Sequence, residues 1–205
     1  MSFEEYWNKV HNQYSLGMPV YDNWLDKYSD IIRTTKTKIL DLGSGTGNDT
    51  LYLINKGYDV IACDYSIVAL DNIKKYIPKA EILLTDISKP LPFNDNTFDL
   101  IIADLSLHYF TEKDTIKILK EIKRVLTCHG TLITRLNSIY DVNYGAGLGK
   151  KIEENYYFVD GYNKRFFSIE DAKKYFSVIG EPKIIETEMN RYTKPKKVIE
   201  VFVTK

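Results

Sequence analysis

The sequence predicts an α/β fold, in which a doubly wound, mostly parallel β-sheet is covered by helices and ends in an antiparallel hairpin. Three observations lead to this prediction. Between residues 37 and 137, short apolar runs alternate with amphipathic stretches. These runs are apolar on both faces, which is typical of parallel strands with helices on each side. Near the C-terminal end, two further runs flank a turn that contains Pro195, a pattern that favours a hairpin.

The elements of this core follow one another in order along the chain. Strands are predicted at 37–42, 58–63, 80–84, 97–104 and 130–137. The first two helices between them are predicted to end near Gly57 and at Pro78, because glycine often follows a helix and proline cannot continue one. Ser66 and Thr111 are suited to cap the N-termini of the second and third helices, since their hydroxyls accept from free backbone N–H groups.

Three other segments complete the single domain that we expect. Residues 1–36 contain both tryptophans and are predicted to form a helical lid. Residues 138–167 are rich in glycine and tyrosine without a clear period, which is typical of a lid or an acceptor-binding insertion. Residues 168–205 are predicted to form a helix and the hairpin, and residues 37–137 form the binding core.

Composition and charge exclude several classes of protein. The 205 residues include 28 basic and 28 acidic side chains, so the formal net charge is zero and no nucleic-acid partner is expected. No apolar run approaches the roughly 18 residues of a membrane helix, and no secretory signal is visible. Cys63 and Cys128 form neither a disulfide framework nor a C-x-x-C metal or redox pair. We expect a cytoplasmic protein without a membrane partner or a metal ion.

The strongest functional signal is a glycine-rich loop after the first predicted strand, in ILDLGSGTGNDT at 39–50. Gly43, Gly45 and Gly47 let the backbone turn tightly and let a ligand approach it closely. Their spacing, G-x-G-x-G, departs from the G-x-G-x-x-G fingerprint of dinucleotide-binding loops. Asp41, directly before the loop, is poorly suited to a pyrophosphate and better suited to holding the loop or facing a cationic ligand.

Two more carboxylates follow the next two predicted strands. Asp64 fits a ribose diol, although an acid at this place also serves as a helix cap. Asp86 is placed to accept a hydrogen bond from an exocyclic amine such as adenine N6. Because the carboxyl ends of neighbouring parallel strands meet at one edge of a sheet, these acids and the glycine loop are predicted to share one crevice.

The order and spacing of these motifs resemble those of the class I S-adenosylmethionine-dependent methyltransferases, in the broad small-molecule branch. The resemblance covers roughly residues 37–137 and rests on LDLGSGTG at 40–47, CDYS at 63–66, TDI at 85–87, PLPFNDNTFDLIIADLSLHYF at 90–110 and RVLTCHGTLI at 124–133. It implies a seven-stranded sheet, S-adenosylmethionine as the cofactor, and methyl transfer to a small-molecule acceptor by in-line displacement. S-adenosylhomocysteine is then the second product.

The resemblance also implies a set of cofactor-binding residues at the ends of the first four strands. In it, the glycine loop passes beneath the methionine part of the cofactor, and Asp41 supports its amino group. Asp64 binds the ribose hydroxyls with Tyr65 near the adenine, and Asp86 accepts from the adenine amine. The full set is Asp41, Gly43, Ser44, Gly45, Gly47, Asp64, Tyr65, Asp86, Ile87, Asp104, Leu105 and Ser106.

The candidate catalytic residue is His108, which follows the fourth strand. Methyl transfer from a sulfonium depends on alignment and exclusion of water, and needs a general base only if the acceptor is protonated. Histidine titrates near neutrality, which suits that role, and a place in the wall of the pocket is the alternative. His129 is interpreted as a surface residue, and His11 as a surface residue in preference to one that lines the lid.

The two variable segments and the end of the fifth strand are expected to supply the acceptor pocket. Its candidate residues are Tyr14, Tyr109, Arg135, Asn137, Tyr157 and Arg165. The aromatic rings favour a flat apolar pocket or a cage for a cation. Arg165 is suited to an anionic acceptor or to a local carboxylate. The basic cluster around the hairpin turn is interpreted as solvated and comprises Arg191, Lys194, Lys196 and Lys197.

Besides a methyltransferase that acts on a macromolecule, for which no N-P-P-Y-type base-reading motif and no RNA-binding module is visible, two other functions stay open on the sequence. One is an NAD(P)-dependent oxidoreductase, which the glycine spacing, Asp41 and the terminal hairpin disfavour. The other is a methyltransferase-like protein that binds the cofactor without turnover. The sequence predicts neither the acceptor atom nor an oligomeric state.

Overall fold

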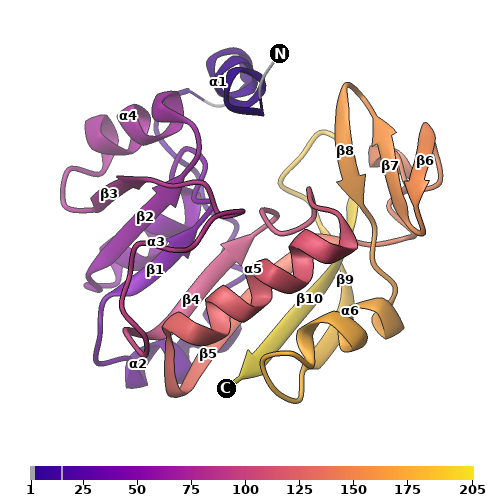
Figure 1. Ribbon diagram of the computed structural model, residues 1–205. Coiled ribbons are helices and arrows are strands. Elements are labelled where there is room, and N and C mark those ends of the chain that lie inside the picture. Colours follow the sequence, from indigo (N-terminus) through magenta and orange to yellow (C-terminus); the bar gives the residue numbers. More distant parts are fainter. Residues whose placement is uncertain (1–2, 15) are drawn as a thin grey trace.

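In the computed structural model, which describes residues 3–14 and 16–205, a seven-stranded sheet has the order β3-β2-β1-β4-β5-β10-β9 (Figure 1). Its strands are β1 Ile39–Leu42, β2 Val60–Asp64, β3 Glu81–Leu84, β4 Phe98–Asp104, β5 Leu126–Asn137, β9 Lys183–Met189 and β10 Lys196–Thr204. Strands β1 to β5 pair in parallel, and β10 runs antiparallel to both β5 and β9. The predicted α/β class, the mostly parallel seven-stranded sheet and the terminal hairpin are confirmed.

Helices cover both faces of this sheet, so the fold is doubly wound. They are α1 Phe3–Tyr14, α2 Ser29–Thr34, α3 Asn48–Asn55, α4 Ile67–Tyr76, α5 Glu112–Val125 and α6 Ile169–Phe176, with short 3-10 turns η1 Asp26–Tyr28 and η2 Val142–Tyr144. Side chains alternate along β4: Ile101 and Ala103 pack in one core with α5 and α6, and Leu100 and Ile102 pack in another with α2 and α3. Two-sided burial explains why the strands are apolar throughout.

The predicted capping residues Ser66 and Thr111 begin their helices as expected, and Ser168 begins α6 in the same way. The hydroxyls of Ser66, Thr111 and Ser168 each accept a hydrogen bond from the backbone N–H three residues later. At Ser168 the side chain of Asp171 also accepts from the Ser168 backbone, which completes a capping box. These caps fix where each helix starts relative to the sheet.

The segment 138–167 differs from the irregular loop that the sequence indicated. It contains β6 Lys150–Glu153, β7 Tyr156–Val159 and β8 Tyr162–Arg165, which form a separate antiparallel sheet in the order β6-β7-β8. Strands of four residues repeat the alternation of side chains too few times to reveal a period. We call this unit the small sheet.

The segment 16–25 also differs, because it contains no helix although residues 1–36 were expected to be helical. Trp24 is held by partners distant in sequence. Its indole N–H donates to Asp49 (2.9 Å), and the guanidinium of Arg135 lies 4.2 Å from the ring centre. Tertiary contacts therefore bury this side chain in a segment that is not helical.

Helix α1 lies at the top of the molecule, between α4 and the small sheet (Figure 1). Its Trp7 ring packs edge-on against Tyr109, with ring centres 4.9 Å apart. Its Tyr6 ring lies 4.8 Å from the ring of Tyr162 on β8, and Asn8 accepts a hydrogen bond from the Ser66 hydroxyl. The helix thus bridges two sides of the sheet's carboxyl edge, as a lid does.

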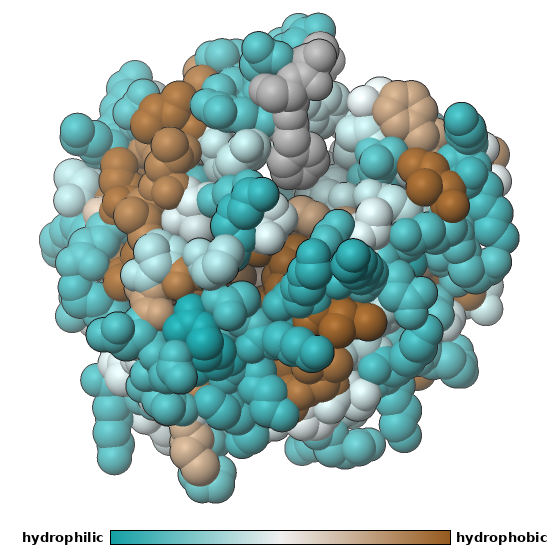
Figure 2. All heavy atoms as spheres, viewed as in Figure 1, coloured by the Kyte–Doolittle hydropathy of each residue, from teal (hydrophilic) through white to brown (hydrophobic). Residues whose placement is uncertain are grey.

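The face shown in Figure 2 is mostly hydrophilic, with hydrophobic residues gathered beside α4 and β3. Among the described residues, Ile67 of α4 and Leu84 of β3 are exposed. No helix in the described ranges is long and apolar enough to cross a membrane.

Candidate functional site

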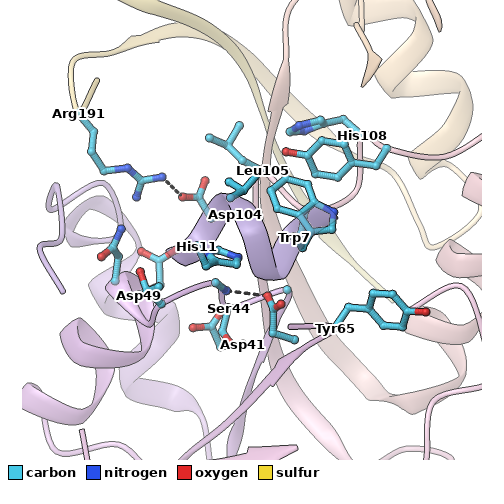
Figure 3. Close-up of a pocket in the computed structure, with 18 of the residues that line it drawn as sticks. Trp7, His11, Asp41, Ser44, Asp49, Tyr65, Asp104, Leu105, His108 and Arg191 are labelled. Atoms are coloured by element: carbon cyan, nitrogen blue, oxygen red, sulfur yellow. Dashed lines mark hydrogen bonds and ion pairs between the residues drawn. The ribbon is translucent and has the colours of Figure 1, made fainter. Parts of the chain in front are cut away.

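A cavity of about 870 Å³ lies at the carboxyl ends of the parallel strands, next to α1 (Figure 3). Loops after β1, β2, β3 and β4 form one part of its wall, and β5, β8 and the turn between β9 and β10 form the other. The predicted cofactor residues that line it are Asp41, Gly43, Ser44, Gly45, Asp64, Tyr65, Asp86, Ile87, Asp104, Leu105 and Ser106. The fold therefore brings eleven of the twelve residues together.

The glycine loop passes between β2 and the loop after β4. A Cβ on Gly43 would lie only 2.3 Å from the Cβ of Ser106. The glycine loop and the loop after β4 can therefore approach each other only because Gly43 has no side chain. Gly45 has φ +53° and its backbone N–H donates to Asp64 (2.8 Å). This conformation disfavours residues with a Cβ.

Gly47 does not line the cavity, unlike the other glycines of the loop. It has φ +98°, and a Cβ there would lie 2.8 Å from both Ile73 of α4 and Ile77, the residue directly after α4. Its missing side chain lets the start of α3 pack against α4. The structure gives Gly47 a packing role and no contact with the cavity.

The two strand-end acids that were predicted to bind a nucleoside are already held in place. The two carboxylate oxygens of Asp64 accept from the backbone N–H groups of Gly45 and Ser66, both at 2.8 Å. One oxygen of Asp86 accepts from the backbone N–H (2.9 Å) and hydroxyl (2.6 Å) of Ser88. A carboxylate oxygen has two lone pairs, so each acid retains acceptor capacity for a ligand.

A cluster of three buried carboxylates occupies the middle of the cavity wall: Asp41, Asp49 and Asp104. Burial, together with Asp104 and Asp64, raises the pKa of Asp41 to about 7, against the lowering effect of the Thr50 hydroxyl that donates to it. Burial, together with Asp104 and Asp41, raises the pKa of Asp49 well above its usual range. A cationic ligand relieves this repulsion.

Asp49 is a site residue that the sequence analysis missed. It lies in the first turn of α3 and lines the cavity while it accepts from Trp24. Its position just after the glycine loop, in GNDT, is the signal that could have found it. No group of His, Cys, Asp and Glu within residues 3–14 and 16–205 is arranged to hold a metal ion.

Asp104 is ionised and joined to two arginines. Burial raises its pKa, but the guanidinium groups of Arg135 and Arg191 outweigh burial and bring it to about 2. Arg135 donates to both carboxylate oxygens, at 2.7 and 2.8 Å, and Arg191 donates to one at 2.9 Å (Figure 3). Arg135 also donates to Asp22 (2.9 Å). It therefore supports Asp104 from outside the cavity and is not one of its lining residues.

The prediction that the basic cluster at the hairpin turn is solvated is wrong for two of its four members. Arg191 and Lys196 line the cavity, whereas Lys194 and Lys197 are exposed. The Lys196 ammonium donates to Asp141, and both side chains are buried. A turn rich in basic residues usually faces water, and only the fold shows that this turn folds back over the site.

Only some of the candidate acceptor residues line the cavity. Tyr109 and Asn137 line the cavity, whereas Arg165 and Tyr157 do not. Arg165 pairs with Glu153. Tyr157 packs against Phe166, with ring centres 6.2 Å apart. The side chain of Tyr14, the last residue of α1, lies outside the described part of the structure.

Four buried polar atoms have no hydrogen-bond partner among the described residues: His11 Nδ1, Ser44 Oγ, His108 Nδ1 and Asn137 Oδ1. All four residues line the cavity. Buried polar groups in folded proteins are nearly always paired, so this set indicates a polar ligand. His11 was interpreted as a surface residue, and that interpretation is wrong because its side chain is buried beside the glycine loop.

His108 is buried in the cavity wall. Burial lowers its pKa well below 6.5, and the positive charges of Lys196 and Lys164 lower it further. The imidazole is therefore neutral at neutral pH and has an acceptor nitrogen. It is a weaker base than the ordinary pKa of histidine suggested.

A family model described as a methyltransferase domain matches residues 39–130. An uncharacterized methyltransferase of Mycobacterium tuberculosis is 30% identical over 123 residues, which are 58% of this chain and 46% of that protein. A demethylmenaquinone methyltransferase of Paenarthrobacter aurescens is 35% identical over 96 residues, which are 47% of this chain and 37% of that protein. The chain thus spans about half or less of the length of these curated relatives.

Solved structures share the fold over most of the chain. An S-adenosylmethionine-dependent methyltransferase from Clostridium acetobutylicum superposes with a TM-score of 0.68 at 20% identity, with 97% of each chain covered. One from Methanosarcina mazei superposes with a TM-score of 0.69 at 21% identity, covering 82% of this chain and 92% of that chain. The similarity extends beyond the motif-bearing core into the two ends of the chain.

Proposed function

We propose that the chain is a class I S-adenosylmethionine-dependent methyltransferase, which transfers a methyl group to a small-molecule acceptor by in-line displacement. The observation that carries the proposal is the single cavity in which strand-end carboxylates and unpaired buried polar atoms meet. Relatives named as demethylmenaquinone methyltransferases favour a small-molecule acceptor. The division into a core at 37–137 with lids at 1–36 and 138–167, and a cytoplasmic location, are parts of the same proposal.

The residues present fit the cofactor. Asp64, already oriented by two backbone N–H groups, is suited to ribose hydroxyls, and Asp86 to the adenine amine. Asp41 and Asp49 balance a sulfonium and an ammonium group, whose charges relieve the repulsion between these acids. When bound, the cofactor supplies a methyl carbon on a sulfonium, so that an acceptor lone pair bonds to carbon as the carbon–sulfur pair returns to sulfur.

We assign the exclusion of water, the acceptance of a proton and the orientation of the acceptor to the chain's own residues. Trp7 and His11 of α1 line the cavity, so that this helix is placed to exclude water. His108 is placed to accept a proton at Nδ1 when the attacking atom of the acceptor carries one. Tyr109 and Asn137 border the same part of the wall and are suited to orient the acceptor.

Two measurements test the proposal. The protein is expected to bind S-adenosylhomocysteine by calorimetry and to form it from S-adenosylmethionine when a metabolite extract is added. Binding without turnover on any extract would favour the cofactor-binding protein without activity. Stabilisation by NAD in place of S-adenosylhomocysteine would favour the oxidoreductase.

Replacement of Asp64 by alanine is expected to weaken binding of S-adenosylmethionine by roughly tenfold to a hundredfold, the range for hydrogen bonds to a charged group. Calorimetry measures this loss, and a thermal melt verifies that the variant is folded. Asp59→Ala is the matched control, because Asp59 is exposed and lies before the opposite end of β2. Equal affinities of the two variants would contradict the ribose assignment.

The lid segments are expected to become ordered around the bound molecules. α1 contacts the loop after β4 and the small sheet through ring contacts, which open more easily than a sheet core. Hydrogen exchange with S-adenosylhomocysteine is expected to show new protection in α1 and in β6 to β8. Helix α6 serves as the internal reference, because none of its residues lines the cavity. Protection confined to the glycine loop would count against a lid.

A further inference from the structure

One part of the cavity carries basic side chains that binding of the cofactor does not use. Lys164 of β8, Arg191 of the hairpin turn and Lys196 of β10 all line it. Their side chains are 7%, 17% and 8% exposed. Burying a cation is costly unless nearby groups of opposite charge compensate for the lost water. Their partners therefore decide what they can bind.

The two lysines gather beside His108. The backbone N–H of Arg165 donates to the carbonyl of His108 (2.7 Å), which joins β8 to the loop after β4 and brings Lys164 next to that loop. The Lys164 ammonium donates to the carbonyl of Tyr144 (3.2 Å), and the Lys196 ammonium lies 4.5 Å from the Tyr144 ring centre. Both ammonium groups thus contact the same tyrosine.

Carboxylates of the chain compensate these two charges only in part. Lys196 donates to the buried Asp141. Lys164 donates to Asp160 (2.9 Å), whose side chain is 64% exposed, so water screens this pair. An ammonium has three N–H donors, and these contacts leave donors of both lysines for a ligand. The positive charges of both lysines also act on His108, because they lower its pKa.

Arg191 differs from the two lysines, because its guanidinium donates to the ionised Asp104, a member of the carboxylate cluster, at 2.9 Å. The charge of Arg191 is therefore already opposed by a carboxylate within the cavity wall. The binding capacity for an anion rests with Lys164 and Lys196.

Aromatic rings line the same part of the cavity. The rings of Tyr109 and Tyr162 lie 5.7 Å apart, and those of Tyr144 and Tyr192 lie 5.6 Å apart. All four tyrosines are cavity residues. Flat walls of this kind suit a planar ligand.

The basic part is well separated from the nucleoside-binding acids. Asp64 ends β2, whereas Lys196 begins β10, and these strands stand four positions apart in the sheet. At about 4.8 Å between strands, the separation is roughly 19 Å. In Figure 3, Arg191 and His108 lie in the upper half of the view on either side of Leu105, and Ser44 and Tyr65 lie in the lower half.

We propose that the methyl acceptor is a small planar organic anion, whose negative group binds Lys164 and Lys196 while its ring lies against the tyrosines. A neutral acceptor leaves the ammonium N–H donors that Asp141 and Asp160 do not engage without a charged partner, and a cationic one is repelled by the two ammonium groups. The inference rests on the proposed methyl transfer. The new bond joins the acceptor's nucleophilic atom to the methyl carbon, the carbon–sulfur pair stays on sulfur, and a proton on that nucleophile passes to His108.

The first test separates this inference from the proposed function. A metabolite extract is divided by ion exchange at neutral pH into anionic, neutral and cationic pools, and S-adenosylhomocysteine formation is measured with each. We expect activity in the anionic pool. Activity confined to the neutral or cationic pool would overturn the anionic acceptor and leave methyl transfer intact. Activity in no pool would overturn methyl transfer itself, and the inference with it.

The second test uses the variant Lys164→Gln, since the screened partner of Lys164 makes it the safer of the two lysines to replace. We expect the KM for the active anionic pool to rise roughly tenfold to a hundredfold, the range for a charged hydrogen bond, with S-adenosylhomocysteine affinity unchanged. Lys151→Gln is the matched control, because Lys151 is an exposed lysine of the small sheet paired with Glu154. An unchanged KM in Lys164→Gln would overturn the assignment of the anion to these lysines.

Discussion

Replacement of Gly45 by valine is expected to abolish binding of S-adenosylhomocysteine while the protein stays folded. Gly45 has φ +53°, where a residue with a Cβ is disfavoured by about 1–2 kcal/mol, and more for a branched one. Within the protein a Cβ at this position meets only the His11 ring, at 3.6 Å. The added methyl groups therefore enter the cavity, where the ligand must lie. Calorimetry on the purified variant measures the loss.

Gly57→Val separates ligand exclusion from backbone strain. Gly57 has φ +91°, a Cβ there meets no atom within 4 Å, and the residue does not line the cavity. Both variants lose some stability, measured by thermal unfolding, but only Gly45→Val is expected to lose binding. Gly43 and Gly47 are poor test positions, since a Cβ at either would collide with protein atoms. Normal binding by Gly45→Val would mean that the loop serves the fold alone.

Replacement of His108 by alanine is expected to lower turnover by roughly 10²–10⁴-fold, the usual contribution of a general base, with cofactor affinity nearly intact. The expectation applies to an acceptor that carries a proton on its attacking atom. His108 lines the cavity, and its Nδ1 has no partner among the described residues. Turnover and S-adenosylhomocysteine affinity are measured on the same preparation.

His129→Asn is the control for this variant. His129 is exposed within β5 at φ +70°, a conformation that asparagine tolerates. Retained turnover in His108→Ala would remove His108 as the base and leave methyl transfer standing. A loss of cofactor affinity would instead make it part of the cofactor pocket.

The pH profile gives His108 a second signature. Burial and two neighbouring lysines hold its pKa well below 6.5, and the neutral ring is the form that accepts a proton. With S-adenosylmethionine at saturation, so that its charge keeps Asp41 ionised, the rate is therefore expected to hold as the pH falls from neutrality to about 6.5, the ordinary value of histidine, and to decline only below it. This acid limb is expected to be absent from the residual activity of His108→Ala. A decline centred at or above the ordinary value would contradict the assignment.

The sequence by itself determined the sheet and the edge of the sheet at which the cavity lies. Runs that are apolar on both faces predict parallel strands, and each strand end is followed directly by the residues that project from it. Asp41, Asp64 and Asp86 could thus be placed at one crevice, because parallel strands deliver their carboxyl ends to the same edge. The capping residues Ser66 and Thr111 could be predicted for a similar reason, because each hydroxyl accepts a hydrogen bond from a backbone N–H only three residues away.

Only the tertiary structure decided the acceptor side. Lys164 and Arg165 are neighbours in sequence, but successive residues of a strand point to opposite faces, so Lys164 faces the cavity and Arg165 pairs with Glu153. The register of the four-residue strands in the small sheet cannot be predicted from the sequence, because so few residues do not reveal an alternation of side chains. Lys196 reaches the site because the terminal hairpin pairs with β5, a contact between residues about 60 positions apart. The net charge of this part of the cavity depends on which carboxylates lie next to its basic side chains. Those carboxylates come from segments that are distant in the sequence.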